Sequence, residues 1–374
     1  MFKKLLTKLK ALSSETSKQQ KEAPSTNTQL SKNIDVNLKF IQDTFVGTSD
    51  LITREFKLGS EQQVKAFVVM IAGLVNEASV NENLMKPLMF IRKELNKENA
   101  FVLVKESALS VANLKDSRTL EETIDSILSG DSALFIDGSD IALVASIRGW
   151  EARGVDEPKT EAVVRGPREG FVESMGTNMA LLRRKIKNPN LKFVSMKIGK
   201  QTKTDICVAY IKGIANEKIV QEVKTRLNRI ETDSILESGY IEAFIEDPPF
   251  SLFPTVGNSE KPDVVSAKLL EGRVVILVDG TPFALTVPYL FIEAFQASED
   301  YYSRPYYASI IRIFRWLSFF LSTFTPGLYV AITTFHQELL PPALLVSIAA
   351  AQEGTPFPAV VEVFVMGIMF EILR

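Results

Sequence analysis

The feature that most constrains the fold of this chain is an internal repeat. Residues 56–77 align without a gap on residues 196–217, at an offset of 140, and the two stretches share seven identical residues. A second pair of stretches, 128–143 and 270–285, aligns at an offset of 142 and shares an Asp-Gly pair. Because two blocks repeat in almost the same register, we expect the chain to contain two related structural units.

Each repeat unit has the sequence pattern of an α/β structure. A glycine among polar residues precedes an apolar, β-branched stretch, which predicts a hairpin leading into strands at 64–71 and 205–211. A second glycine then ends each strand, and amphipathic helices follow at 80–95 and 218–227. The Asp-Gly pairs predict tight two-residue hairpin turns between two further strands of each unit.

These patterns predict two duplicated α/β lobes, at 48–150 and 190–291, each a mixed sheet with helices packed on it. Two paired lobes are able to enclose a ligand cleft, or to act as rigid packing modules. A fold alone does not decide between these roles, and we favour the packing modules.

The sequence before the first lobe is polar. Residues 1–34 carry seven lysines against two glutamates, and residues 13–31 are rich in Ser, Thr, Gln and Lys. Such a segment buries too little apolar surface to fold, so residues 1–47 are expected to be a disordered tail and lead-in. The alternative is a weak interfacial helix, in which the first lysines contact anionic lipid.

The end of the chain has the opposite composition. Residues 316–335 contain no charged side chain, and a helix of these twenty residues is about 30 Å long, the thickness of a bilayer's hydrocarbon core. Two further apolar stretches, 339–351 and 356–370, are short and are typical of broken, tilted or re-entrant helices. Arginines and tyrosines directly before residue 316 predict, by the positive-inside rule, that the preceding part is cytoplasmic. We therefore expect residues 292–374 to be an α-helical transmembrane region.

One acidic residue lies within the last apolar stretch. Glu362 stands between Val361 and Val363. A carboxylate in hydrocarbon is energetically costly and usually faces a bundle interior or an ion path. Glu362 and Val363 are therefore candidate pore-lining residues. The alternative is that Glu362 reaches the membrane interface from the end of a short span.

The composition argues against several classes of function. One cysteine (Cys207) and one histidine (His336) leave no disulfide framework, no zinc site built on these residues and few histidine-based triads. A net charge of −2 argues against a general nucleic-acid binder. Cys207 lies in an apolar strand, where it is expected to be inert core. Because no acid–base constellation is visible, we predict neither an enzyme nor a cofactor or metal site.

A connector at 151–189 contains an Arg-Gly-Pro-Arg-Glu-Gly motif. Glycine and proline fix a bend, and the two arginines are able to hold carboxylates in bidentate geometry. The motif lacks the spacing of a phosphate-binding loop, so we expect a structural clamp at the lobe junction. The residues assigned to this clamp are Arg165, Gly166, Pro167, Arg168, Phe171, Glu173 and Asn178.

The connector is expected to end in a helix that begins near Thr177 or Asn178, since asparagine is a good N-cap. Its pattern divides into two faces. The apolar side contains Leu181, Leu182 and Ile186, and the outer, solvated side is expected to contain Arg183, Arg184, Lys185 and Lys187.

The connector resembles the signature of the A subunits of GerA-family spore germination receptors. The family pattern is Val-Arg-Gly-Pro, then Phe-x-Glu, then Asn, then Leu-x-Arg or a similar run. It is met here by Val164, Arg165, Gly166, Pro167, Phe171, Glu173, Asn178, Leu182 and Arg183 or Arg184. Stretches at 259–288, 299–302 and 335–358 resemble further family motifs in the same order, so the resemblance runs from about residue 45 to the end.

The resemblance implies a membrane subunit of a nutrient (germinant) receptor that triggers bacterial spore germination. It places the chain in the inner membrane of the spore as a multi-pass protein with cytoplasmic N-terminal lobes. The implied partners are a transporter-like B subunit that binds the germinant, a C-subunit lipoprotein, the lipid membrane and further copies of the chain. Such copies, as a pentamer in the family, would form a nutrient-gated cation channel.

The chain departs from the family pattern in two places. The family continues into further membrane helices, so we expect the membrane domain to be truncated where this chain stops, at Arg374. The family also often has an acidic residue where Gly367 stands. The alternative function is a nutrient-binding or transporter-type subunit, in which the two-lobed soluble part binds the ligand.

Overall fold

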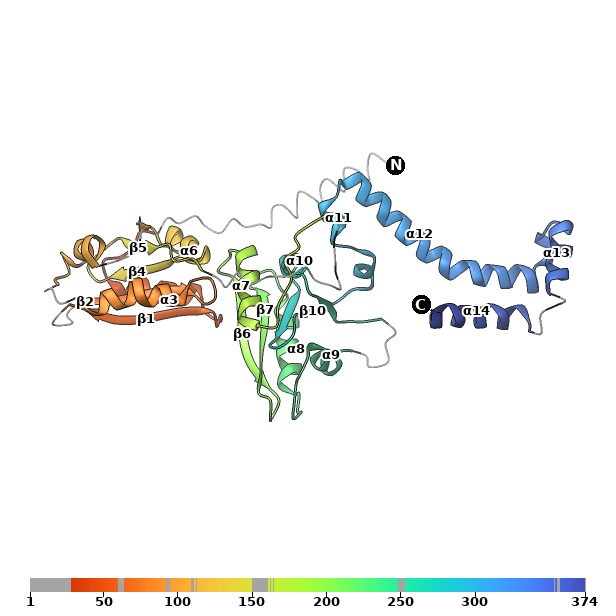
Figure 1. The fold of residues 1–374 in the computed structure, drawn as a ribbon, viewed down its shortest axis with the longest axis horizontal. Coiled ribbons are helices and arrows are strands. Elements are labelled where there is room, and N and C mark those ends of the chain that lie inside the picture. Colours follow the sequence, from red (N-terminus) through yellow and green to blue (C-terminus); the bar gives the residue numbers. More distant parts are fainter. Residues whose placement is uncertain are drawn as a thin grey trace. The chain divides into compact units, whose positions relative to one another are not determined.

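The structure is a computed structural model of the 374-residue chain. It describes residues 28–59, 64–91, 95–108, 111, 113–149, 161, 163, 165–247, 253–352, 354 and 357–373. Residues 1–27 of the expected tail, most of the connector before 165 (Val164 included) and Arg374 lie outside the described residues. The described chain divides into two compact units (Figure 1). One holds the residues before 163 together with Arg168–Tyr289, and the other holds Val163–Pro167 with the residues from Leu290 onward.

The first lobe is built on a five-stranded sheet. Its strands are β1 (Leu51–Leu58), β2 (Val64–Ile71), β3 (Leu114–Ser117), β4 (Ser132–Ile136) and β5 (Ala142–Ala145). They lie in the order β1-β2-β4-β5-β3, and each neighbouring pair is antiparallel. The expected strand at 64–71 is therefore present as β2, and its almost continuous apolar sequence reflects burial on both faces.

The second lobe repeats this sheet. Its strands are β6 (Leu191–Ile198), β7 (Thr204–Ile211), β8 (Gly257–Ser259), β9 (Val274–Val278) and β10 (Ala284–Val287). The order is β6-β7-β9-β10-β8, again antiparallel throughout. Val68 pairs with Leu134 in the first sheet, and Val208 pairs with Ile276 in the second. The two sheets therefore have the same order and the same register.

The prediction of mixed sheets is wrong, because the described strand pairs are all antiparallel. Helix α6 (Leu120–Leu128) joins β3 to β4, which run in the same direction, as in a parallel crossover. However, β5 lies between them and pairs antiparallel with both. Helix α10 (Pro262–Leu270) joins β8 to β9 in the same way, with β10 between them. A hairpin strand inserted into the crossover thus separates the two parallel strands.

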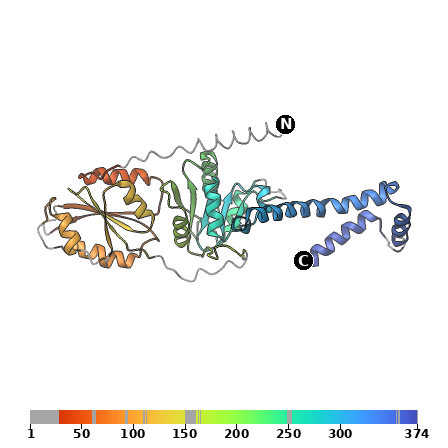
Figure 2. The ribbon, with the colours of Figure 1, turned by 90° about the horizontal axis from the view of Figure 1, so that it is seen from above.

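Helices cover both faces of the first sheet, as Figure 2 shows for the strands and helices of residues 28–149. Helix α2 (Ile34–Thr44) and α6 pack on the face that receives Phe67, Val69 and Ile71 of β2. The other face, with Ala66 and Val68, is covered by α3 (Glu77–Val80), η1 (Asn81–Met85), α4 (Lys86–Met89), α5 (Ala100–Leu103) and η2 (Val104–Ala108). Alternate side chains of one strand therefore enter two cores.

The second lobe has the same three layers. Helix α7 (Met175–Lys185) packs with α10 on one face of its sheet, where Phe193, Cys207 and Leu277 are buried. Helices α8 (Glu217–Asn228) and α9 (Ser238–Ile245) pack on the other face. Cys207 has no solvent-exposed surface, which confirms its prediction as core, and burial raises the pKa of its thiol.

Each lobe begins with a helix that an asparagine fastens in place. The Asn37 amide accepts from the Ser31 N–H at 2.9 Å and donates to the Ser31 carbonyl at 2.7 Å. The Asn178 amide makes the same two bonds with Val172, at 2.8 and 2.6 Å. Both asparagines are buried. Asn178 is thus a buried residue that ties α7 to the backbone of Val172. The N-cap of α7 is Ser174 and not Asn178.

Residues grouped with the polar tail before 48 belong in part to the first lobe. Leu30, Ile34 and Ile41 are buried in the core that α2 shares with β2. Asn33 caps α2 by accepting from the Asp35 N–H. The first lobe therefore begins before residue 48, and the prediction of an unfolded lead-in is wrong for residues 30–45.

The Asp-Gly pairs form longer turns than expected. Five residues, 137–141, separate β4 from β5, and 279–283 separate β9 from β10, so neither connection is a two-residue hairpin. Gly138 and Gly280 have φ angles of +91° and +90°, which glycine adopts without strain. The Gly138 N–H donates to the Lys32 carbonyl, and the Gly280 N–H donates to the Glu173 carbonyl. Each turn thereby anchors the start of its lobe's first helix.

The second compact unit, which contains the residues from Leu290 onward, is mainly helical. It contains η3 (Phe291–Phe295), α11 (Glu299–Tyr302), α12 (Pro305–Val330), η4 (Ala331–Phe335), η5 (Gln337–Leu339), α13 (Pro342–Gln352) and α14 (Ala359–Leu373). Among the described residues, the run Pro305–Phe335 is the helix long and apolar enough to cross a membrane. It contains Pro326 without ending there. Helices α13 and α14 correspond to the two shorter apolar stretches expected from the sequence.

Candidate functional site

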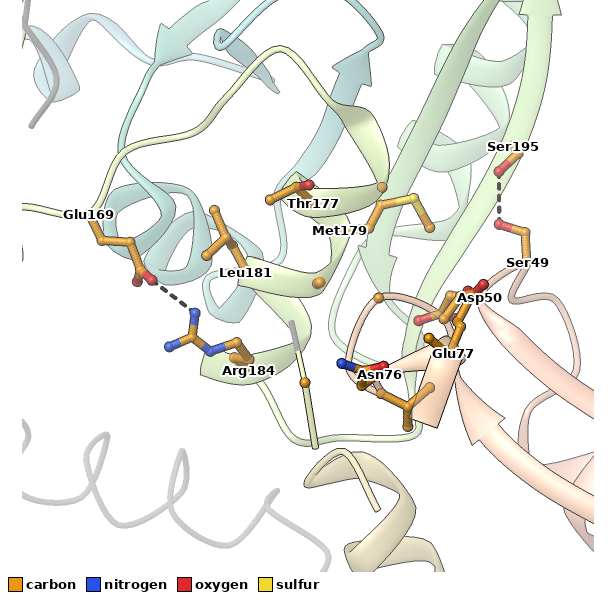
Figure 3. Close-up of a pocket in the computed structure, with 17 residues that line it drawn as sticks. Ser49, Asp50, Asn76, Glu77, Glu169, Thr177, Met179, Leu181, Arg184 and Ser195 are labelled. Carbon is orange, nitrogen blue, oxygen red and sulfur yellow. Dashed lines mark hydrogen bonds and ion pairs between the residues drawn. The ribbon is translucent and has the colours of Figure 1, made fainter. Parts of the chain in front are cut away.

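A groove of about 930 Å³ lies at the junction of the two lobes (Figure 3). Its lining comes from both sides of the junction: from the first lobe Gly73, Asn76 and Glu77, and from the connector and second lobe Glu169, Thr177 and Arg184. A volume of this size accommodates a small organic molecule.

The first lobe presents the turn after β2 and the start of α3 to this groove. Gly73 has a φ angle of +76°, and a Cβ placed on it would lie 3.1 Å from the Ala180 Cβ of α7. Glycine is thus needed here for its conformation and for the close approach of α7. Asn76 caps α3 by accepting from the Ser79 N–H at 2.9 Å. The next residue, Glu77, is exposed and lines the groove.

The second lobe presents one face of α7, from Gly176 to Arg184. A Cβ on Gly176 would meet no atom within 4 Å, so the groove is open above this residue. Arg184 on α7 pairs with Glu169 at 3.0 Å, and Lys185 pairs with the other oxygen of Glu169 at 3.2 Å. Figure 3 shows the Glu169–Arg184 ion pair among the residues that line the groove. A carboxylate (Glu77) and a guanidinium (Arg184) therefore line the same groove.

A buried ion pair joins the two lobes beside the groove. The Arg183 guanidinium of α7 donates from Nε and Nη2 to the two carboxylate oxygens of Asp50, each at 3.0 Å. It also donates to the Asn188 carbonyl at 3.0 Å and lies 4.9 Å from the centre of the Phe193 ring. Arg183 has no exposed surface, and burial lowers its pKa while Asp50 opposes that shift. The prediction that Arg183 lies on the solvated side of the helix is wrong.

The segment before β1 pairs with the edge strand of the second sheet. The Ser49 N–H donates to the Phe193 carbonyl at 2.9 Å, and the Ser49 and Ser195 hydroxyls are 2.8 Å apart. Next to Phe193, the Lys192 ammonium is buried and donates to the Thr44 carbonyl at the end of α2, at 3.0 Å. Burial lowers the pKa of Lys192 to about 8, and the charges of Lys212 and Arg183 add to this shift.

The connector motif is divided between the two compact units. Arg165, Gly166 and Pro167 belong with the helical unit, where a Cβ on Gly166 would lie 2.9 Å from the Tyr302 ring. Arg165 is exposed and makes no ion pair with another described residue. The buried arginine at the lobe junction is therefore Arg183, and not Arg165 as the sequence predicted.

The rest of the motif belongs with the lobes. Arg168 is exposed. Phe171 is buried in the second lobe's core, and its N–H donates to the Glu260 carbonyl at 2.7 Å. The Glu173 side chain is exposed, while its carbonyl accepts from Gly280. Phe171, Glu173 and Asn178 thus hold the start of α7 on the second lobe and do not line the groove.

The two candidate pore residues lie near the start of α14. Glu362 lies in its first turn and Val363 follows it, and both side chains are half-buried. His336 lies between η4 and η5, after the long apolar helix. The described residues contain no group of three or more His, Cys, Asp or Glu placed to hold a metal ion.

The comparisons with known proteins agree with this architecture. The model of the Bacillus/Clostridium GerA spore germination protein family matches residues 39–374. Spore germination protein KA of Bacillus subtilis (strain 168) is 46% identical over 356 residues, which cover 95% of this chain and 65% of that protein. Spore germination protein GerLA of Bacillus cereus is 36% identical over 347 residues, covering 92% of this chain and 70% of that protein.

A solved structure matches the lobes. It is the crystal structure of the N-terminal domain of the A subunit of the Bacillus megaterium spore germinant receptor GerK3, with a TM-score of 0.57 and 40% identity. The match covers 71% of this chain and 98% of that domain. The fold therefore defines a two-lobed α/β protein of the germinant-receptor A-subunit type, followed by an apolar helical region. The chain belongs to the GerA family of spore germination proteins. It spans about two thirds of the length of these relatives.

Proposed function

We propose that the chain is a membrane-spanning subunit of a germinant receptor that acts, as an oligomer, as a nutrient-gated cation channel. The observation that carries this proposal is the apolar helical unit. Helix α12 exposes large apolar side chains along its length, among them Leu317, Leu321 and Phe324. Water-exposed apolar surface of this extent is unfavourable, whereas a bilayer or neighbouring subunits would cover it. We infer that α12 crosses the membrane.

Glu362 and Val363 are the proposed pore residues. Glu362 is an acidic side chain among apolar neighbours in α14, where it is half-buried. A ring of such carboxylates, one from each subunit, would favour cations. Apolar side chains beside it, such as Val363, would close the path by excluding water. A nutrient would open the path by binding a partner that contacts the closed and open states differently.

The proposed assembly follows the family. Its partners are the B and C subunits of the receptor, further copies of this chain (a pentamer in the proposal) and lipid, and no nucleic acid. In the proposal the lobes lie on the cytoplasmic side of the inner spore membrane, because Arg304, Arg312 and Arg315 before the uncharged stretch 316–335 fit the positive-inside rule. We also propose that the lobes arose by duplication. This origin is supported by the equal strand order and by the equal hydrogen bonds that the Asn37 and Asn178 side chains make with the preceding backbone.

The channel proposal is tested by ion release from germinating spores. We expect Glu362→Gln to slow nutrient-triggered cation release and Val363→Ala to cause release at lower nutrient levels or without nutrient. Glu371→Gln, an acid-to-amide change near the end of the same helix, is the matched control and is expected to behave as the parent. If both pore variants release cations like the parent, Glu362 is an interfacial residue and the path lies elsewhere.

A second function is favoured by the groove between the lobes. We propose as the alternative that it binds the nutrient, because Glu77 and Arg184 offer opposite charges and Ser49 and Thr177 offer hydroxyls to a small polar molecule. Gly176→Leu would place an apolar side chain in the groove, where a Cβ at this position meets no atom within 4 Å.

The two functions give different results with this variant. If the groove binds the nutrient, Gly176→Leu is expected to abolish the response of spores to that nutrient while the protein stays folded. Gly176→Ala, which adds one methyl group and improves helix propensity by up to about 1 kcal/mol, is the matched control. An unchanged nutrient response of the leucine variant would leave the groove without a role in sensing.

A further inference from the structure

A short apolar segment lies directly before the long helix. Residues Leu290–Phe295, of which Phe291–Phe295 form η3, present three large apolar side chains to the outside: Leu290, Phe291 and Ile292 are 47%, 40% and 50% exposed. Glu293, the acidic residue of the segment, is buried instead. The segment thus turns its apolar side chains outward and its carboxylate inward, the reverse of a water-facing turn.

Aromatic contacts fix this segment against one level of α12. The Phe295 ring stacks on Trp316, with ring centres 4.3 Å apart and an angle of 19° between the planes. Phe295 and Phe291 also contact Phe319 edge-on, at 5.1 and 6.0 Å. Trp316 and Phe319 form the first turn of the uncharged stretch 316–335. The segment therefore lies at the level where α12 becomes free of charge.

Charged side chains mark the other side of this level. The Asp300 carboxylate, only 5% exposed, accepts from Arg312 Nε at 3.0 Å and from Arg315 at 3.1 Å. Arg315 also donates to the Phe295 carbonyl, so the same residue ties the segment and Asp300 to α12. The two arginines thus lie directly before the uncharged stretch of α12, and both are tied to the residues that precede this helix.

We propose that Leu290–Phe295 is a membrane-interface wedge, whose partner is the lipid bilayer itself. The exposed side chains of the wedge enter the boundary between headgroups and acyl chains, in the leaflet that α12 enters first. The inference rests on the membrane placement of α12 proposed above. Given that placement, the ring contacts put the wedge at the same depth as Trp316, and tryptophan and arginine at this boundary are typical of the interface.

The test measures the depth of a fluorescent label on the full chain in anionic lipid vesicles. The background is Cys207→Ala, which removes the buried thiol, and single cysteines are introduced at exposed positions. Ile292→Cys reports on the wedge, Leu321→Cys on α12 within its uncharged stretch, and Val46→Cys on the first lobe. Quenching is compared between aqueous iodide and a phospholipid with a nitroxide near the headgroup end of its acyl chain.

The expected result separates the wedge from the lobe. A group held about 5–10 Å into the interface should be quenched roughly threefold more strongly by the nitroxide lipid than by iodide, and the Val46 label should show the reverse. If the Leu321 label is quenched by lipid but the Ile292 label only by iodide, the wedge is overturned and the membrane span stands. If the Leu321 label is not quenched by lipid, the span and the wedge both fail.

Protein cover is the competing outcome. A label at Ile292 that neither quencher reaches would mean that another subunit, and not lipid, covers the segment, and would overturn the proposal. Phe295→Ala removes the ring that stacks on Trp316 and is expected to reduce lipid quenching of the Ile292 label at least about twofold. Phe314→Ala removes an exposed ring of α12 outside this cluster and is the matched control, expected to leave the quenching unchanged.

Discussion

The two lobes share their backbone plan and differ in the side chains they use where they meet. Gly138 and Gly280 occupy the same place in the two sheets, with φ angles of +91° and +90°. A Cβ on Gly138 would lie 2.7 Å from the Lys97 carbonyl oxygen, whereas a Cβ on Gly280 would meet nothing within 4 Å. The repeat therefore preserves what the backbone conformation requires, and each copy adds its own packing.

Each buried charged residue compared at the junction has no charged equivalent at the aligned position of the other lobe. Asp50 of the first lobe is buried, while Asn190, at the equivalent position before β6, is exposed. Lys192 on β6 is buried, and its equivalent on β1 is Ile52. Polar residues that bind one lobe to the other thus stand at positions where the repeat is broken.

The largest effect is expected from breaking the buried pair. Arg183→Met leaves the Asp50 carboxylate buried without its cation, so the free energy of unfolding should fall by about 3–5 kcal/mol. Urea denaturation of residues 28–289 measures this. Asn190→Ala, at the exposed position of the second lobe that aligns with Asp50, should change the free energy of unfolding by no more than about 0.5 kcal/mol.

The paired replacement sharpens the result. Asp50→Leu combined with Arg183→Met removes both charges and should recover much of the loss, because an apolar pair needs no charge compensation. A loss below about 1 kcal/mol for Arg183→Met alone would show that the pair contributes no more than a surface ion pair.

An intermediate effect is expected at the paired glycines. Gly280→Ala forces alanine into a left-handed conformation and should destabilise the lobes by about 1–2 kcal/mol. Gly138→Ala adds overpacking against Lys97, so its total should reach about 2–4 kcal/mol. Thermal denaturation of the two variants side by side measures the difference. Equal losses would mean that the loop containing Lys97 yields, and that the copies do not differ in packing here.

The last prediction concerns the pH dependence of stability. The pKa of Lys192 is about 8 in the folded protein against an ordinary value of 10.5, so the unfolded chain binds its proton more tightly. The contribution of Lys192 to the free energy of unfolding should therefore rise as the pH increases from about 8 to 10.5. Lys192→Ile, which introduces the residue of the first lobe, should lose this rise. Contributions of the buried Cys207 thiol cancel in the comparison of variant and parent.

The control for the pH experiment lies on the same strand. Lys197 is exposed on β6, and Lys197→Ile should keep the pH dependence of the parent. Parallel stability curves for the parent and Lys192→Ile between about pH 8 and 10.5 would contradict the buried-ammonium interpretation.

Most of the fold was predictable from the sequence because the repeat carries it. The strands β2 and β7 and the apolar helices follow from local patterns that tertiary structure did not override. The strand directions could not be predicted in this way. A helix between two strands indicates a parallel crossover, and it gives no sign that β5 is inserted between β3 and β4. Helix α2 was missed for a different reason, because its apolar residues follow directly on a polar tail.

The site was harder to predict than the fold. Arg165 and Arg168 were predicted to form the clamp because glycine and proline surround them. The structure shows instead that Arg183 forms the buried pair. Arg183 stands in a run of four basic residues within 183–187, and helical periodicity alone does not distinguish it from Arg184. Its partner Asp50 lies 133 residues away, in another lobe. The one available signal was the broken repeat, in which Asp50 aligns with Asn190 at the offset of 140.

Helix α7 also affects how the protein is made. Its Ala180 packs into the first lobe's core, and its Leu181 and Leu182 pack into the second lobe's core. During synthesis the first lobe leaves the ribosome before Ala180 and Arg183 exist, so its core and the Asp50 carboxylate must wait for a later part of the chain. The newborn first lobe is therefore an incomplete folding unit. A ribosome that pauses between the lobes would hold exposed apolar surface that chaperones recognise.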